Sequence, residues 1–249
     1  MAAADGESRH QGVSHLSKSR ERIAGMFDAI APRYDFLNHL LSAGIDRQWR
    51  RKAIRSLVLT GGERVLDLCT GTADLAIAAR TMRPAARQVV GLDFAGAMLL
   101  VGREKLRSRK LGGITLVRGD ATRIPLADSS VDAVTVAFGI RNVEDPAAAC
   151  GEIYRVLRPR GRLAILEFSI PTAPGVRALY LWYFSRVLPQ IGRLVSRHSS
   201  AYGYLPTSVE TFASPDEFVT ILRQSGMCDV AAVPLTCGIV FLYVGRRGA

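Results

Sequence analysis

The residues best suited to chemistry are acidic side chains placed around a single glycine turn. An apolar segment, residues 65–69, leads into Gly71, and a second apolar segment ends at Asp93, about 20 residues further along the chain. Where strands and helices alternate, a carboxylate that ends the second strand lies where the ribose hydroxyls of a bound nucleoside would be. The spacing therefore predicts a cofactor that contains a nucleoside.

The composition of the turn indicates which cofactor that is. A dinucleotide site holds a pyrophosphate on backbone N–H groups and usually carries three glycines, whereas this turn has only Gly71. S-adenosylmethionine (SAM) has no phosphate, and it requires acidic groups for its ammonium and its ribose. Asp67, Asp74 and Asp93 supply such groups. Because one glycine between a strand and a helix is also common turn chemistry, the turn alone leaves a nicotinamide or another nucleoside ligand open.

The elements that must position these residues alternate regularly. Strands in such an alternation pair in parallel, and helices cover both faces, so the carboxyl ends of the strands meet at one edge. The predicted fold class is α/β, a doubly wound, mostly parallel, seven-stranded Rossmann-like sheet with N-terminal helices and a helical insertion. The segments 67–73, 120–121 and 138–142 would lie at the carboxyl edge with Asp93. The predicted strands are 65–69, 88–93, 114–118, 131–138, 162–168, 227–233 and 239–245, and the helices among them are 72–82, 95–109, 146–157 and 214–226.

The remaining segments frame this unit. At 249 residues the chain is long enough for one α/β domain with additions. Residues 1–18 are polar and lack periodicity, so we expect a disordered leader followed by a single domain over residues 19–249. Residues 19–60 are predicted to form three helices, the third with Asp46 as its N-cap, and 171–212 a mostly helical insertion.

Composition restricts the partners only loosely. The formal net charge is +11, and most of the 33 basic residues are arginines spread over nearly every segment. Dispersed charge is a weaker sign of nucleic-acid binding than a patch, and an anionic membrane surface suits it equally well. No apolar run is long enough to span a membrane and no signal peptide is recognisable, so we expect a cytoplasmic protein. The four cysteines lack zinc-site spacing, and we expect them to be reduced and mostly buried.

Several short motifs, in a fixed order, point to a family. They are Tyr34-Asp35-Phe36-Leu37-Asn38 with Ser42 and Trp49, Gly102-Arg103-Glu104-Lys105-Leu106, Phe138-Gly139-Ile140-Arg141-Asn142, Arg155-Val156-Leu157-Arg158-Pro159-Arg160-Gly161, Glu167-Phe168-Ser169, Leu188-Pro189 and Tyr202-Gly203-Tyr204-Leu205. From about Met26 to Tyr243 the chain resembles the SAM-dependent C-methyltransferases that methylate quinone precursors, the demethylmenaquinone and ubiquinone-pathway enzymes. The resemblance implies a class I methyltransferase that converts demethylmenaquinol to menaquinol, with a benzoquinol as a further acceptor.

The resemblance also implies cofactor-binding roles for residues at the carboxyl edge. Asp93 would accept hydrogen bonds from the ribose hydroxyls, or it would instead cap the helix that begins near Ala95. Asp120 and Ala121 would contact the adenine, or serve the turn. Thr72 would lie against the methionine portion, or act as a helix N-cap. Gly71 and Asp67 complete the expected cofactor set, and no metal is expected.

Arg141 and Asn142 are the residues expected to meet the acceptor. They follow an apolar strand, where a guanidinium and an amide would be poorly placed in a core, so they face either solvent or a ligand. Beside a quinol they could hold the ring and stabilise negative charge on its oxygen. Tyr34, on a helix that covers the site in the family, is the third catalytic candidate, as a proton carrier in place of water.

Two departures from the family concern the site directly. The family often has His where Asp46 stands, so Asp46 removes an imidazole from that place. It also often has Ser where Ala137 stands, so Ala137 removes a hydroxyl contact to the cofactor. His39 and His198 are lone histidines, expected to be satisfied or exposed and not to act as the base.

The segment 178–184 is unusually aromatic and lies between Arg177 and Arg186. Such a segment suits an interfacial helix, the wall of an apolar substrate site, or a buried helix of the domain. We therefore expect a prenylated quinol as substrate and peripheral contact with a membrane surface, expect no nucleic acid, and leave a homodimer open. The alternatives are a methyltransferase that acts on another small molecule or on RNA, and a nucleotide-binding module without enzymatic activity.

Overall fold

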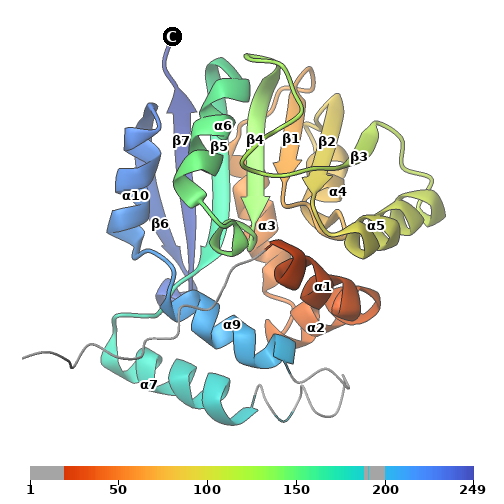
Figure 1. Ribbon diagram of the computed structural model, residues 1–249. Helices are drawn as coiled ribbons and strands as arrows, with labels where there is room; N and C mark the ends of the chain where they lie inside the picture. The colour runs from red at the N-terminus through yellow and green to blue at the C-terminus, as the bar shows by residue number, and fades with distance from the viewer. Residues whose placement is uncertain (1–19, 188–189, 191–199) are drawn as a thin grey trace, which may run out of the picture.

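The computed structural model describes residues 20–187, 190 and 200–249. The predicted leader, residues 1–18, lies outside the described residues, and so does His198. Within the described part, a seven-stranded sheet carries helices on both faces and a group of further helices at one edge (Figure 1). This arrangement confirms the predicted fold class.

The strand order of the sheet is β3-β2-β1-β4-β5-β7-β6. Strands β1 to β5 pair in parallel, and β7 runs antiparallel to both of its neighbours. Because β1 lies between β2 and β4, the chain leaves β1 on one side and returns on the other, and ligands of open α/β sheets bind at such a switch point. The strands are β1 Arg64–Leu68, β2 Gln88–Asp93, β3 Ile114–Arg118, β4 Val131–Ala137, β5 Leu157–Phe168, β6 Met227–Leu235 and β7 Val240–Arg247.

The core consists of two apolar layers separated by the sheet. Val65 belongs to the layer under α3, α4 and α5, while Leu66 and Leu68 belong to the layer under α6 and α10. Successive side chains of a strand point to opposite faces, so a strand covered on both faces reads as a continuous apolar run. The helices are α1 Arg20–Ile30, α2 Tyr34–Leu41, α3 Asp46–Ser56, α4 Asp74–Thr81, α5 Gly96–Ser108, α6 Pro146–Val156, α7 Pro174–Trp182, α9 Ser200–Glu210 and α10 Pro215–Gln224, with short helical segments η1 Ala31–Arg33, η2 Ile140–Asn142, η3 Tyr183–Val187 and η4 Thr236–Gly238.

Local signals account for several helix ends. Asp145 caps α6 by accepting the N–H of Ala148 at 2.9 Å, and Ser214 and Glu217 form a capping box at the start of α10. The prediction that Asp46 is an N-cap is wrong. The cap position is Ile45, and Asp46 is the first helical residue, whose carboxylate is turned toward other side chains.

The helices that do not cover the sheet faces gather at its carboxyl edge. In Figure 1 the arrowheads of β1, β2 and β4 point toward α1 and α2, and α7 and α9 lie at the same end of the molecule. These are the predicted N-terminal helices and the helical insertion. Within residues 20–187 and 200–249, no helix combines the length and the apolar composition needed to cross a bilayer.

The cysteines only partly follow the prediction. All four are free thiols, and Cys150 is buried. Cys69 is half-buried, while Cys228 and Cys237 are exposed, so the expectation that most are buried is wrong. Cys228 lies near the start of the edge strand β6, and Cys237 lies in η4, which connects β6 to β7.

Candidate functional site

A narrow cavity lies at the carboxyl ends of β2 and β3. Asp93, Asp120 and Ala121 line it together, with Cys69 and Asn142. The structure thus brings together the strand-end residues that the sequence places at the ribose and the adenine. Asp93 and Asp120 supply carboxylate oxygens there, which can accept hydrogen bonds from hydroxyl groups.

Asp93 is held in place by backbone donors. Its carboxylate accepts the N–H of Gly71 at 2.8 Å and the N–H of Ala95 at 2.9 Å, and only 6% of the residue is exposed. Burial raises the pKa of Asp93, against the effect of these N–H groups. The N-cap position of α5 is Ala95 itself, so Asp93 supports the start of α5 from outside the helix.

The turn after β1 requires left-handed backbone. Gly71 has a φ of 54° and Ala73, the N-cap of α4, a φ of 69°. Asp67 lies beneath this turn, 1% exposed, and accepts hydrogen bonds from the hydroxyls of Thr70 at 2.5 Å and Thr135 at 2.8 Å. Asp67 therefore shapes the turn, and its contact with a cofactor stays a prediction.

The turns after β1 and β4 touch at a glycine. A Cβ added at Gly139 would lie 2.3 Å from the Cβ of Cys69, which is impossible without a shift of backbone. Gly139 therefore sets how closely the segment 138–142 approaches the turn after β1. A small residue at Cys69 serves the same contact.

A second, larger cavity of about 560 Å³ lies beside the first and is mostly apolar. Phe138 and Phe168 stack with centroids 4.5 Å apart, and Trp49 meets Phe138 edge-on at 5.9 Å. This aromatic wall suits a flat ring. Residues of α1, α2, α3, α7 and η3 complete the lining, among them Met26, Phe27, Leu37, Leu41, Val176, Leu179, Tyr180, Trp182 and Tyr183.

Arg141 lines this larger cavity but is not a free cation. Its Nη1 donates to Glu167 Oε1 and to the carbonyl oxygen of Phe138, each at 2.6 Å, and its Nε donates to Ser208 Oγ at 3.3 Å. Glu167 is 0% exposed and Arg141 5%. The expectation that a guanidinium is poorly placed in the interior is wrong, because Glu167 neutralises it there.

Asn142 lies in a different neighbourhood from Arg141. It is buried and lines the narrow cavity, and its amide oxygen accepts a hydrogen bond from the Tyr204 hydroxyl at 3.1 Å. The short η2 helix directs the two consecutive side chains to different cavities. The structure therefore does not bring Arg141 and Asn142 to the same cavity, as a shared contact with one acceptor ring would require.

Arg50 is a second guanidinium of the larger cavity that the sequence reasoning did not select. It pairs with Asp46, four residues earlier on α3, and lies 6.0 Å from the centre of the Phe138 ring. Asp46 also accepts from Ser42 Oγ at 2.9 Å and lies 2.8 Å from Nδ1 of His39. Burial opposes ionisation of Asp46, but Arg50, His39 and Ser42 lower its pKa overall.

An imidazole does reach the place of Asp46, but it comes from another residue. Although Asp46 stands where the family often has His, the imidazole of His39 lies against it. His39 is satisfied by that contact, as expected of a lone histidine.

The signal that could have identified Arg50 is its spacing of four residues from Asp46 on a predicted helix.

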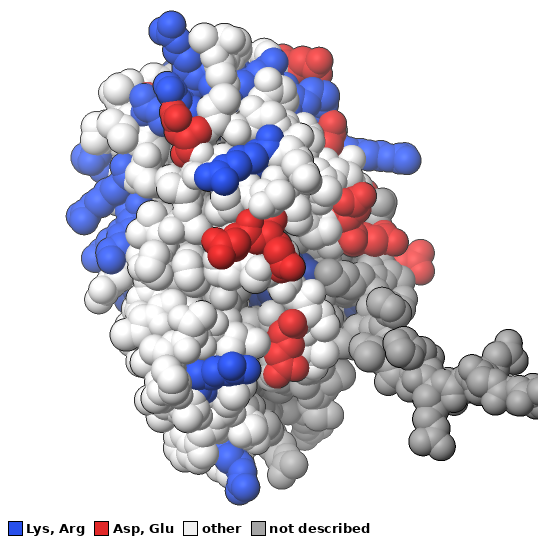
Figure 2. All heavy atoms as spheres, turned by 90° about the vertical axis from the view of Figure 1, so that its left-hand side faces the viewer, with Lys and Arg blue, Asp and Glu red and all other residues white. Residues whose placement is uncertain are grey.

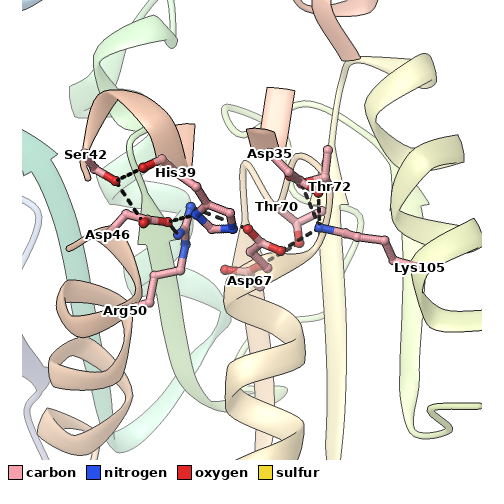
Figure 3. A network of polar contacts seen from close by, with 10 residues as sticks. Asp35, His39, Ser42, Asp46, Arg50, Asp67, Thr70, Thr72 and Lys105 are labelled. Carbon is pink, nitrogen blue, oxygen red and sulfur yellow. Dashed lines mark hydrogen bonds and ion pairs between the residues drawn. The ribbon is translucent and has the colours of Figure 1, made fainter. Parts of the chain in front are cut away.

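Helix α2 is joined to the turn after β1 by a polar cluster (Figure 3). Asp35 of α2 accepts from Thr72 Oγ1 at 2.5 Å and pairs with Nζ of Lys105 at 2.7 Å. Lys105 also pairs with Asp74 at 2.5 Å. Burial opposes ionisation of Asp74, but Lys105 and Arg50 lower its pKa overall. We refer to Asp35, Thr72, Asp74 and Lys105 as the lid lock.

Tyr34 lies on the same helix and faces the larger cavity. It meets Phe27 edge-on with ring centroids 6.1 Å apart. Burial raises the pKa of Tyr34, although Asn38, Arg141 and Arg50 act in the opposite direction. At neutral pH Tyr34 therefore keeps its hydroxyl proton.

The sequence comparisons agree on one family. The model of the ubiE/COQ5 methyltransferase family matches residues 15–247. The ubiquinone/menaquinone biosynthesis C-methyltransferase UbiE of Geobacter sp. strain M21 is 49% identical over 93% of this chain and 99% of its own length. The demethylmenaquinone methyltransferase of Thermus thermophilus is 45% identical over 89% of this chain and 100% of its own.

Solved structures with low sequence identity share the fold. The YcgJ protein of Bacillus subtilis superposes with a TM-score of 0.60 at 15% identity, over 82% of this chain and 99% of that one. A SAM-dependent methyltransferase of Thermotoga maritima superposes with a TM-score of 0.62 at 16% identity, over 90% and 99%. The sheet and the helices that cover it are therefore those of a widely used scaffold.

Proposed function

The chain belongs to the ubiE/COQ5 methyltransferase family, and from that premise we propose that it transfers the methyl group of SAM to a ring carbon of a prenylated quinol. The acceptor we favour is demethylmenaquinol, which becomes menaquinol. Relatives named for both pathways, at 49% and 45% identity, support a naphthoquinol acceptor and make a benzoquinol the second candidate.

One observation supports this function above the others: the segment 138–142 forms part of the wall of both cavities. On one side is a narrow opening with Asp93 and Asp120. On the other is a mostly apolar space of about 560 Å³, rich in aromatic side chains, with Arg141 and Tyr34 among its polar groups. Such a pair of adjacent cavities suits a methyl donor that contains a nucleoside and an apolar acceptor ring, which must come into contact for the transfer.

The residues at the narrow cavity fit SAM. Asp93 offers buried carboxylate oxygens for the ribose, Asp120 and Ala121 line the same cavity and are the proposed contacts of the adenine, and the turn that contains Gly71 supports Asp93. When bound, SAM supplies a methyl group already activated by a sulfonium. The task of the chain is then to align donor and acceptor, exclude water and keep the acceptor electron-rich.

The larger cavity is suited to that task. The aromatic wall of Phe138, Phe168 and Trp49 orients a flat ring, and N–H groups of Arg141 lie where they can stabilise a phenolate oxygen. A phenolate makes the neighbouring ring carbon nucleophilic. The hydroxyl proton passes to water as the phenolate forms. With SAM as the methyl donor, the ring carbon would gain the methyl group and lose its own proton to water, and the phenolate oxygen would take a proton back. Tyr34, held protonated, donates a hydrogen bond to the second ring oxygen.

The direct test is methyl transfer by the purified protein. With labelled SAM, we expect label in the product of the reduced naphthoquinol, less in that of the reduced benzoquinol, and none with the oxidised quinones or with RNA. Label in RNA, or none with either quinol, would contradict the proposal. Peripheral association with a membrane, where such an acceptor resides, is part of the proposal.

A variant series separates the role of Arg141 in the reaction from its role in folding. Arg141→Met should lower kcat about 100-fold and leave the Kd of SAM nearly unchanged, because the guanidinium lies in the acceptor cavity. It should also destabilise the fold, because Glu167 is left buried without its partner. Adding Glu167→Gln should restore stability but not turnover. Recovery of turnover in the double variant would contradict a role for Arg141 beside the acceptor.

A further inference from the structure

Exposed apolar side chains are concentrated on two helices at the carboxyl edge. Five of the eight large hydrophobic residues that the described chain exposes lie on α2 and α7. They are Phe36, Leu40, Leu179, Leu181 and Trp182. Large apolar side chains gathered at one end of a molecule mark an interaction surface.

This surface surrounds the opening of the larger cavity. Leu179 is 64% exposed and Trp182 56%, yet both line that cavity, so they lie where it opens to the outside. Helix α2 is joined here to η3, which directly follows α7, because the Tyr183 hydroxyl donates to the carbonyl oxygen of Leu41 at 3.1 Å. A ligand that enters here passes directly from the apolar surface to the aromatic wall.

The insertion that carries α7 has charge of one sign. From residue 168 to residue 209 the chain contains four arginines and no acidic residue. Two of these arginines, Arg177 and Arg186, flank the exposed part of α7 and η3. In Figure 2 the lower end of the molecule, which α7 forms in Figure 1, is mostly white with basic side chains, and an acidic group lies just above it.

We propose that the exposed faces of α2 and α7 dock on an anionic lipid surface and that the larger cavity opens toward the bilayer, so that the acceptor enters from the lipid and not through water. The inference rests on the proposed function, because a prenylated quinol is dissolved in the membrane. Phe36, Leu40, Leu181 and Trp182 enter the apolar side of the interface, and Arg177 and Arg186 meet the head groups.

The charge distribution favours lipid over a second copy of the chain. A symmetric dimer through this surface would bring the arginines of two copies toward one another. Phosphate-rich head groups compensate the same charges, and the apolar side chains between them require a surface that is apolar within a few ångströms of its charged layer.

Vesicle co-sedimentation tests the docking surface. The protein should bind vesicles of phosphatidylglycerol and phosphatidylcholine at least tenfold more strongly than vesicles of phosphatidylcholine alone. The double variant Phe36→Glu/Leu181→Glu changes two exposed residues that do not line the cavity, and it should weaken binding about tenfold or more. The matched control Leu100→Glu/Val233→Glu, at exposed apolar residues elsewhere, should bind like the wild type.

Two further measurements complete the test. Arg177→Gln/Arg186→Gln should remove most of the preference for anionic vesicles, even if the glutamate variant does not fold. Folded variants should methylate a short-tailed, water-soluble quinol at the wild-type rate and lose activity only on acceptor held in vesicles. Equal vesicle binding by all variants, or a dimer in solution that the glutamate variant dissociates, would overturn the docking proposal. Failure of the wild type on the soluble quinol would instead overturn the proposed function.

Discussion

At the scale of single residues, buried carboxylates of this site differ by their partners. Asp74 is paired with Lys105, and its pKa is lowered overall although burial opposes this. Asp67 has only hydroxyl and N–H donors, from Thr70, Thr135 and Ala76, and burial raises its pKa to about 6. A neutral donor compensates less of the cost of burying a charge than a cation does. Asp67 therefore makes the protein's stability depend on pH.

The folded state binds a proton at Asp67 more tightly than the unfolded chain, whose pKa is near 3.8. Stability from this residue is thus fully present below about pH 4 and is lost as the pH rises through about 6. The free energy of unfolding of the wild type minus that of Asp67→Asn should fall by about 2 kcal/mol between pH 4 and pH 7. Urea unfolding at a series of pH values measures it.

Glu63 provides a control of opposite sign. Burial raises its pKa, but hydrogen bonds from Thr60 and Gly61 together outweigh this effect and lower the pKa to about 2. The stability that Glu63 contributes is therefore present above its ordinary pKa of 4.5 and is lost as the pH falls toward 2.

If the difference in the free energy of unfolding between the wild type and Asp67→Asn did not change with pH, the raised pKa of Asp67 would be contradicted.

At the scale of elements, helix α2 has two functions that meet at the lid lock. Its inner side, with Tyr34 and Leu37, covers the larger cavity, while Asp35 binds the turn that carries Thr72. The position of α2 over the larger cavity is thereby tied to the position of the turn after β1. Since Thr72 is the residue predicted to meet the methionine portion, ligand binding and lid position should influence each other.

Opening the lid lock should loosen α2 specifically. In Lys105→Met, amide hydrogen exchange of α2 should quicken by about fivefold to tenfold, because Asp35 and Asp74 lose a partly buried partner. The matched control is Arg107→Met, which lies on α5 like Lys105 but whose ion pair with Glu104 is exposed. Faster exchange of α2 in the control, or unchanged exchange in Lys105→Met, would contradict the lid lock.

At the scale of the whole molecule, the site lies between the packed core of the sheet and a group of helices that is less tightly packed against it. The sheet and its helices bury two continuous apolar layers. The group of α1, α2, α7 and α9 lies at the carboxyl edge, largely outside these layers, and encloses a cavity of about 560 Å³. A ligand that fills the space between the core and these helices should therefore stabilise the molecule as a whole.

We expect SAM at 100 times its Kd to raise the free energy of unfolding by about 2.7 kcal/mol and Tm by about 5–10 °C. NAD at the same concentration should leave Tm unchanged. Asp93→Asn should abolish most of the shift, because a neutral amide replaces a charge-assisted acceptor. Asp128→Asn, at a side chain that is 76% exposed, should keep it. Calorimetric scanning measures all four, and a full shift with NAD would contradict the cofactor assignment.

The sequence by itself determined the order of the strands and helices and the turn around Gly71. Apolar periodicity and turn chemistry are local properties, and each is set by a few neighbouring residues. The meeting of Asp93, Asp120 and Ala121 also followed from the sequence, because the carboxyl ends of parallel strands must share an edge.

Only the tertiary structure decided which charges are compensated and which cavity each side chain lines. Arg141 and Glu167 are 26 residues apart, and Lys105 and Asp35 are 70 apart. A charged residue after an apolar strand looks the same in sequence whether it faces solvent, ligand or a buried partner, since that choice depends on what the fold brings opposite to it. The separation of Arg141 from Asn142 depended in the same way on the path of one short helix between two cavities.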